Sequence, residues 1–120
     1  MQDRPTAAEA VEAVAAFLEG ELMPELEGAA GFQVRVAANL LAIVARELRL
    51  GPGLDREERS RLEALLGGEG ELAELNRELA ARLRSGELDD SSEALLSHLR
   101  LTARARLEVA SPGLLKDSTD

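Results

Sequence analysis

The longest apolar stretch of the chain, residues 32–48 (FQVRVAANLLAIVAREL), has polar side chains at only a few positions. At 100° per residue, Arg35, Asn39 and Arg46 fall in one narrow stripe of the helix that this stretch predicts, while most of the circumference is aliphatic. A helix that is apolar on nearly every side belongs in the middle of a fold. We therefore expect a central buried helix over about residues 32–50, whose polar stripe finds partners inside the molecule or faces a cleft.

A first helix is predicted ahead of this central one. Thr6 and Glu9 have the spacing of a capping box, in which each side chain bonds the backbone amide of the other residue. Pro24 suits the first position of a renewed helical turn, so we expect a break near Met23. The apolar positions between these two signals recur at helical spacing and predict an inner face made of Val11, Val14, Phe17, Leu18 and Leu22.

Glycine and proline predict the end of the central helix at Gly51-Pro52-Gly53. Asp55 can cap a short third helix, which then turns its leucines inward before the glycine-rich loop at residues 67–70. A fourth helix follows and ends at Ser85-Gly86. The inner residues expected on these two helices are Leu62, Leu65, Leu66, Leu72, Leu75, Leu79 and Leu83.

Residues 89–93 (DDSSE) offer several caps for a last helix, which Ser111-Pro112-Gly113 should close. Its inner face is predicted to contain Leu96, Leu99, Ala103 and Leu107. The fold class that we predict is all-α, a single-domain bundle of four to five helices over residues 1–111, with residues 112–120 as a flexible tail.

The amino-acid composition supports the all-α prediction and argues against several classes of function. Leucine and alanine make up more than a third of the 120 residues, which suits aliphatic packing between helices within one domain. The net charge of −9 argues against general nucleic-acid binding and against adsorption to an anionic membrane. With no cysteine, disulfides and thiolate metal sites are excluded. We expect a cytoplasmic protein, since no signal peptide is evident and residues 32–48 are too short and too interrupted by charge for a membrane span.

The stripe of Arg35, Asn39 and Arg46 has two interpretations. In the structural one, which we favour, the arginines pair with acids of neighbouring helices and Asn39 bridges helices. In the functional one, both guanidinium groups converge on a phosphate or carboxylate. His98 could act as a base beside such a site, but it has no nucleophile at a recognisable spacing, so we expect a hydrogen-bonded structural histidine.

No catalytic or cofactor signature stands out elsewhere. The glycine clusters at residues 51–53 and 67–70 lack the Gly-Lys-Ser/Thr element of a phosphate-binding loop, and a single histidine cannot form a histidine metal cluster. We therefore predict no catalytic residues, no metal and no cofactor. The candidate ligand-binding residues are Arg35, Asn39, Arg46 and His98.

The chain resembles an uncharacterised bacterial family of short acidic helical proteins. The resemblance runs from Asp3 to Pro112 and is strongest over two elements of the apolar stretch, Arg35-Val36-Ala37-Ala38-Asn39 and Ala45-Arg46-Glu47-Leu48. Members of this family are often encoded beside aminoglycoside-phosphotransferase-like kinases and acyl-CoA dehydrogenases. The resemblance thus implies a non-catalytic accessory or interaction module, whose partner is the neighbouring kinase-like or acyl-CoA dehydrogenase-like enzyme or a second copy of the chain. The alternative is a small-molecule binder or minor enzyme that uses Arg35 and Arg46.

Overall fold

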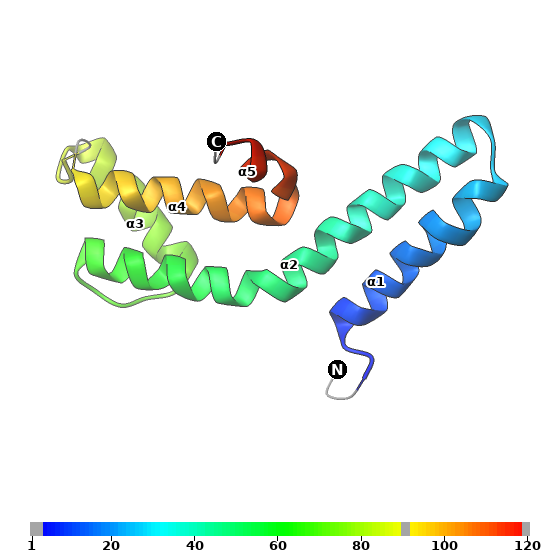
Figure 1. Ribbon diagram of the computed structural model, residues 1–120. Coiled ribbons are helices and arrows are strands. Elements are labelled where there is room, and N and C mark those ends of the chain that lie inside the picture. Colours follow the sequence, from blue (N-terminus) through cyan, green and yellow to red (C-terminus); the bar gives the residue numbers. More distant parts are fainter. Residues whose placement is uncertain (1–3, 90–91, 119–120) are drawn as a thin grey trace.

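The computed structural model describes residues 4–89 and 92–118, and these residues contain helices and no strand. The predicted all-α, single-domain fold is confirmed. Figure 1 shows the order of the elements along the chain. They are α1 (Ala7–Phe17), the π-helical turn η1 (Leu18–Leu22), the 3-10 turn η2 (Met23–Glu25), α2 (Gly28–Leu66), α3 (Leu72–Ser85), α4 (Glu93–Ala110) and α5 (Pro112–Ser118).

The predicted beginning and end of the first helix are confirmed. The Thr6 hydroxyl accepts a hydrogen bond from the Glu9 amide at 3.1 Å, and the Glu9 carboxylate accepts one from the Thr6 amide at 3.1 Å. Helical geometry then loosens through η1 and changes to 3-10 at Met23, where Pro24 follows. The chain reverses at this point, so that α1 and the first half of α2 form a helical hairpin.

The prediction that a helix ends at Gly51-Pro52-Gly53 is wrong. One helix, α2, continues for 39 residues with Pro52 inside it, and it absorbs the predicted third helix. Proline removes one backbone hydrogen bond and its ring crowds the carbonyl four residues earlier, so a helix that continues must bend. Figure 1 shows α2 bent near its middle. Packing of each half of α2 on other helices outweighs the local cost of the proline.

The buried core of the C-terminal half lies between the second half of α2, α3 and α4. Leu62 is fully buried, and the leucines predicted to face inward on α3 pack with it. The residues of this cluster are Leu62, Leu66, Leu75, Leu79 and Leu95. Tight helix ends frame it, because Gly67 and Gly86 both adopt the left-handed backbone conformation that glycine reaches without strain.

The face that α4 turns inward differs from the prediction. Leu95 and His98 are buried, whereas Leu99 and Ala103 are exposed. The inner face is therefore rotated toward His98, which was expected to be a structural histidine but was not among the inner residues predicted for this helix. The rotation is stable because His98 has a hydrogen-bond partner on α2, Arg61.

The molecule is elongated, with principal extents of 58 × 37 × 26 Å and a radius of gyration of 19.0 Å. A compact domain of this length would have a radius of gyration of about 14 Å. The hairpin and the C-terminal half extend in different directions from the bend in α2, and α1 contacts none of α3, α4 or α5 within the part of the chain that the structure describes. Only α2 joins the two halves.

The predicted burial of the helix at residues 32–50 is consequently wrong over most of its surface. In this segment only Ala38 and Ala45 are buried, while the Phe32 side chain is 68% exposed. These residues are apolar and helical as predicted, but α1 covers only one side of the helix that they form. Residues 112–118 of the expected tail form α5, which contacts α4. The predicted caps at residues 90–91 and the last two residues lie outside the described residues, and Ser92 caps α4.

We expect Leu62→Ala to destabilise the fold by about 2–5 kcal/mol, because it leaves a cavity in the leucine core. The matched control is Leu114→Ala, which removes the same atoms from a side chain that is 56% exposed and should change stability by less than about 0.5 kcal/mol. Urea unfolding followed by circular dichroism measures both. Equal effects for the two variants would contradict the placement of this core.

Candidate functional site

The polar stripe predicted on the central helix is split between two environments. Arg35 and Asn39 are exposed, and their side chains have no hydrogen-bond or ion-pair partner among the described residues. Arg35 borders a hollow of about 350 Å³ at the turn into α2. Arg46 lies three helical turns further along and is partly buried. The two arginines are separated by about 16 Å of helix axis.

Arg46 makes the contact that joins the hairpin to the C-terminal half. Its Nε donates a hydrogen bond of 2.7 Å to the backbone carbonyl of Val109, 63 residues away. This carbonyl belongs to the last turn of α4, where carbonyl groups lack helical partners and carry the negative end of the helix dipole. The partner of Arg46 is thus a helix end, where the sequence had suggested an acidic side chain.

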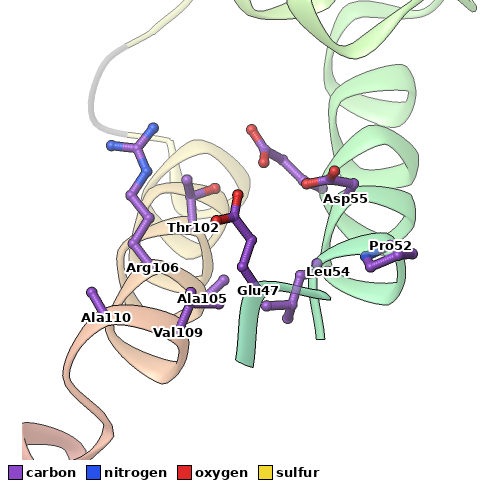
Figure 2. Close-up of a pocket in the computed structure, with 11 residues that line it drawn as sticks. Glu47, Pro52, Leu54, Asp55, Thr102, Ala105, Arg106, Val109 and Ala110 are labelled. Atoms are coloured by element: carbon purple, nitrogen blue, oxygen red, sulfur yellow. The ribbon is translucent and has the colours of Figure 1, made fainter. Parts of the chain in front are cut away.

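A groove lies beside this contact, between the bend of α2 and the end of α4. It has a volume of about 530 Å³, and Pro52 and Val109 are among its apolar lining residues. Figure 2 shows Glu47 extending between the two helices, with Arg106 on the α4 side. Asp55 and Glu58 add two more carboxylates. The groove is therefore more acidic than basic, which does not suit an anion.

His98 lies in a different place, in the interface of α2 and α4. It is 2% exposed, and its Nδ1 accepts a hydrogen bond of 3.0 Å from Arg61 Nε. The same guanidinium donates to the Thr102 hydroxyl at 3.2 Å. Burial lowers the pKa of His98, and the positive charge of Arg61 lowers it further, while Glu58 opposes the shift. A neutral histidine in a fixed hydrogen bond matches the structural role expected for it.

The four candidate ligand residues are not brought together. Arg35 and Asn39 lie on the hairpin, Arg46 is held by Val109, and His98 lies three helical turns from Val109 along α4. Within the described ranges, no group of three or more histidine, aspartate or glutamate side chains could hold a metal ion. This geometry offers no converging set of groups for acid–base or nucleophilic chemistry.

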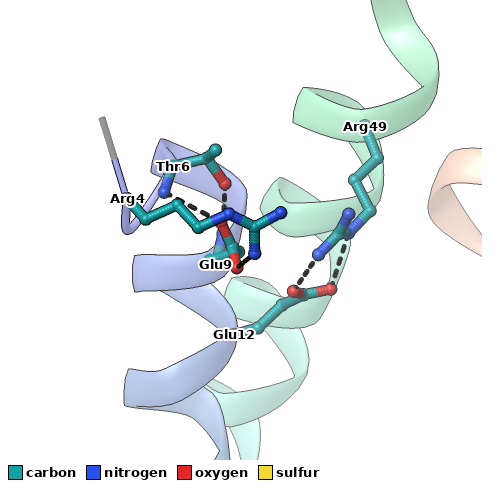
Figure 3. Close-up of polar contacts among 5 residues, drawn as sticks. All are labelled: Arg4, Thr6, Glu9, Glu12 and Arg49. Carbon is teal, nitrogen blue, oxygen red and sulfur yellow. Dashed lines mark hydrogen bonds and ion pairs between the residues drawn. The ribbon is translucent and has the colours of Figure 1, made fainter. Parts of the chain in front are cut away.

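An exposed ion pair joins the two helices of the hairpin on one of its broad faces. Arg49 of α2 donates two hydrogen bonds to the Glu12 carboxylate of α1, one of them 2.8 Å from Nε (Figure 3). The hydrogen bond from Arg49 lowers the pKa of Glu12, and the positive charge acts in the same direction. The pair therefore marks a polar face of the hairpin.

The opposite broad face of the hairpin is apolar. On a helical wheel, Leu40, Val44 and Leu48 lie on one side of the line through buried Ala38 and Ala45, and Arg49 lies on the other. On α1, the residue opposed to Glu12 across the contact with α2 is Val14, followed by Phe17. Since Glu12 meets Arg49, the apolar sides of both helices share one face. We call this the apolar face; its residues are Val14, Phe17, Val36, Leu40, Val44 and Leu48, all of them exposed.

The side chains that are fully buried in the hairpin of α1 and α2 are small. The buried residues of the hairpin are Ala8, Ala38 and Ala45, and no larger side chain is buried in it. Alanine lets two helices approach closely but removes little apolar surface from water. Several large apolar side chains of the hairpin are nevertheless exposed, with Leu40 57% exposed and Phe17 51% exposed, while others, such as Val11 and Ile43, are partly buried.

By length and composition alone, α2 is apolar enough to cross a membrane, and only 11% of its most apolar window is buried. The core helix of a soluble protein can be equally long and apolar, but such a helix is mostly buried. The window is too exposed to be such a core helix in one copy of the chain. The finding therefore adds to the evidence that this surface is unusually apolar.

Sequence reasoning missed the apolar face and the role of Arg61. The spacing Phe32, Val36, Leu40, Val44 and Leu48, four residues apart, could have indicated a second apolar surface on a helix already covered on one side by α1. Nothing local to Arg61 predicts its bond to His98, since the two residues are 37 positions apart.

We expect the pH dependence of stability to report on His98. The pKa of His98 is lower in the folded state than in the unfolded state. His98 therefore leaves the stability of the fold unchanged above the unfolded pKa of about 6.5. Below that pH the unfolded chain binds the proton more readily than the folded chain does, so the fold loses stability as the pH falls. His98→Asn keeps an acceptor for Arg61 but does not titrate. The loss in unfolding free energy between about pH 7.5 and pH 5.5 should be smaller in the variant than in the wild type. Equal losses would show that His98 titrates alike in both states.

Comparison with known proteins agrees with the resemblance seen in the sequence. Searches among curated proteins and among solved structures found no match. A family defined as Domain of unknown function (DUF6285) matches residues 24–114, a region that contains α2, α3, α4 and the groove at the bend but leaves out α1. That region is three quarters of the chain, and the chain therefore belongs to the DUF6285 family.

Proposed function

We propose that this chain is a non-catalytic interaction module that binds another protein through the apolar face of its hairpin. The observation that carries the proposal is the position of six exposed large apolar side chains on one side of two neighbouring helices. Contiguous exposed apolar surface of this kind is rare on isolated soluble proteins and marks sites of interaction.

A protein is a better occupant of this face than a lipid bilayer. Burying α2 in a membrane would take Arg35 and Asn39 with it, at a cost of about 2.5–3.5 kcal/mol for an arginine near the bilayer centre. A protein partner needs to cover only the apolar face and leaves the Glu12–Arg49 face in water. We therefore keep a cytoplasmic location in the proposal.

The resemblance implies which enzymes to test. Proteins of this kind are often encoded beside phosphotransferase-like kinases and acyl-CoA dehydrogenase-like enzymes, so the module is proposed to act as an accessory to one of them. In this role the chain contributes binding surface, and the enzyme contributes the catalytic groups.

The test is retention of each neighbouring enzyme by the immobilised chain. We expect the wild type to retain one of them and Leu40→Glu to retain at least about 10-fold less, because a carboxylate buried in an apolar contact costs more than 1.4 kcal/mol. The matched control is Asn39→Glu, which adds the same charge to the adjacent exposed position on the side of the polar stripe and should bind like the wild type.

Two results would contradict the proposal in different ways. If the wild type retains neither enzyme, the accessory role is wrong. If Leu40→Glu retains the enzyme as well as Asn39→Glu does, the enzyme does not depend on the apolar face. Circular dichroism of both variants confirms that each remains helical before binding is compared.

The second candidate is a small-molecule binder that uses the polar stripe. The observation in its favour is that Arg35 and Asn39 have no partner among the described residues and that Arg35 borders a hollow. A phosphate or carboxylate compound bound there would stabilise the folded state by about 2.7 kcal/mol when its concentration is 100 times its dissociation constant. The thermal midpoint would rise accordingly. The test is a thermal-shift screen of CoA esters, sugar phosphates and nucleotides on the wild type and on Arg35→Gln. We expect none of these compounds to raise the thermal midpoint of the wild type through Arg35. A rise that is seen in the wild type and lost in Arg35→Gln would favour this candidate over the first.

A further inference from the structure

We infer that a hollow between α2 and α4, beside the buried His98, binds a small monocarboxylate with a short apolar chain. The hollow has a volume of about 300 Å³ and lies in the C-terminal half, where α2 and α4 are side by side (Figure 1). Its lining residues are Arg61, Ala64, Leu65, Ala94, Ser97 and His98. None of them belongs to the hairpin, so the inference goes beyond the proposed interaction role.

His98 provides a hydrogen-bond donor that the protein itself does not use. Its Nδ1 accepts a hydrogen bond of 3.0 Å from Arg61 Nε, so the proton of the neutral ring is on Nε2. Nε2 has no hydrogen-bond partner among the described residues. Every buried side-chain nitrogen or oxygen atom in that part of the chain has a partner, so Nε2 must reach solvent. Because His98 is only 2% exposed and borders the hollow, its Nε2–H group faces into the hollow.

Arg61 provides a positive charge that lacks a carboxylate partner. Its guanidinium donates to His98 and, at 3.2 Å, to the Thr102 hydroxyl, and both of these acceptors are neutral. No carboxylate forms an ion pair with it within the described ranges. Glu58, one turn earlier on α2, accepts a hydrogen bond from Asn76 of α3 instead. Since a partly buried charge is costly without a counter-charge, an anion in the hollow would complete the pairing of Arg61.

The other lining residues suit an anion that has an apolar body. Ala94 and Ser97 lie near the start of α4, where the positive end of the helix dipole favours an anion. The exposed Ser97 hydroxyl is a further donor. No carboxylate is among the described lining residues, and Ala64, Leu65 and Ala94 offer apolar contact to a short aliphatic chain.

A monocarboxylate fits this hollow better than a phosphate does. A phosphate carries more than one negative charge at neutral pH, which is unfavourable on a chain of net charge −9. It also has no apolar part to cover the alanine and leucine side chains of the hollow. A volume of about 300 Å³ is at the lower end for ligand sites, so the ligand is small. Butyrate has a suitable size and carries both the carboxylate and an apolar chain.

The experiment follows the ring protons of His98 by NMR in the full chain, which contains one histidine. Sodium butyrate is added at constant ionic strength and at about pH 7.5, where His98 is neutral. We expect a saturable change in the His98 shifts with a dissociation constant of about 1 mM, which is within reach of a ligand of this size. Phosphate added in the same way should give no saturable change.

Two variants with matched controls place the ligand in the hollow. Ala94→Leu occupies part of the hollow without removing a donor and should weaken binding at least about 10-fold, whereas Ala103→Leu makes the same change at an exposed position of α4 outside the hollow and should bind like the wild type. Arg61→Gln removes the positive charge and should also weaken binding at least about 10-fold. Its control, Arg59→Gln, removes an exposed charge of α2 and should change binding by less than about 2-fold.

The absence of a saturable change in the wild type would overturn the inference. Equal binding by Ala94→Leu and Ala103→Leu would overturn it as well, because the ligand would then lie elsewhere. Saturation by phosphate and not by butyrate would exclude a carboxylate as the ligand. Circular dichroism checks that each variant is helical, and if Arg61→Gln is not, the two alanine variants decide, because both positions are exposed. The result is separable from the enzyme proposal, since none of these substitutions alters the apolar face.

Discussion

The structure depends on the continuity of α2 through Pro52. A helix that ended there would give a conventional bundle, with the apolar segment surrounded by its neighbours. Because the helix bends and continues, its first half packs mainly on the hairpin partner α1 and its turns, and it meets α4 near the bend, where Arg46 bonds to the Val109 carbonyl. The exposed position of the most apolar segment of the chain follows directly from this one backbone choice.

The hairpin and the C-terminal half differ in how their side chains are packed and hydrogen-bonded. In the C-terminal half, leucines form a closed core and arginines bond to groups that would otherwise be left unpaired: Arg61 to His98, and Arg82 to the Leu66 carbonyl at the end of α2. Arg46 does the same for the end of α4. In the hairpin, the buried side chains are alanines, and larger apolar side chains are partly buried or exposed. One half encloses its leucines within a single chain, and the other leaves large apolar side chains such as Leu40 exposed.

Sequence reasoning predicted elements where local signals decide them. The capping box at Thr6, the break near Met23 and the leucine face of α3 depend on a few adjacent residues, and all are present. Pro52 shows the limit, because tertiary packing on both sides of it outweighs a strong local signal. The face of α4 and the partner of Arg46 depend on contacts between distant segments, which a single sequence does not reveal.

The bond between Arg46 and the Val109 carbonyl gives the bend in α2 a mechanical meaning. It braces the inside of an elbow whose two arms share no other helix. The hairpin arm extends about 30 Å from Pro52, so a change of about 10° in the elbow would move its tip by about 5 Å. A ligand or enzyme bound in the groove beside Val109 would therefore act close to the bend, where a small change in angle produces a large displacement of the hairpin tip. The position of the hairpin would then depend on whether the groove is occupied.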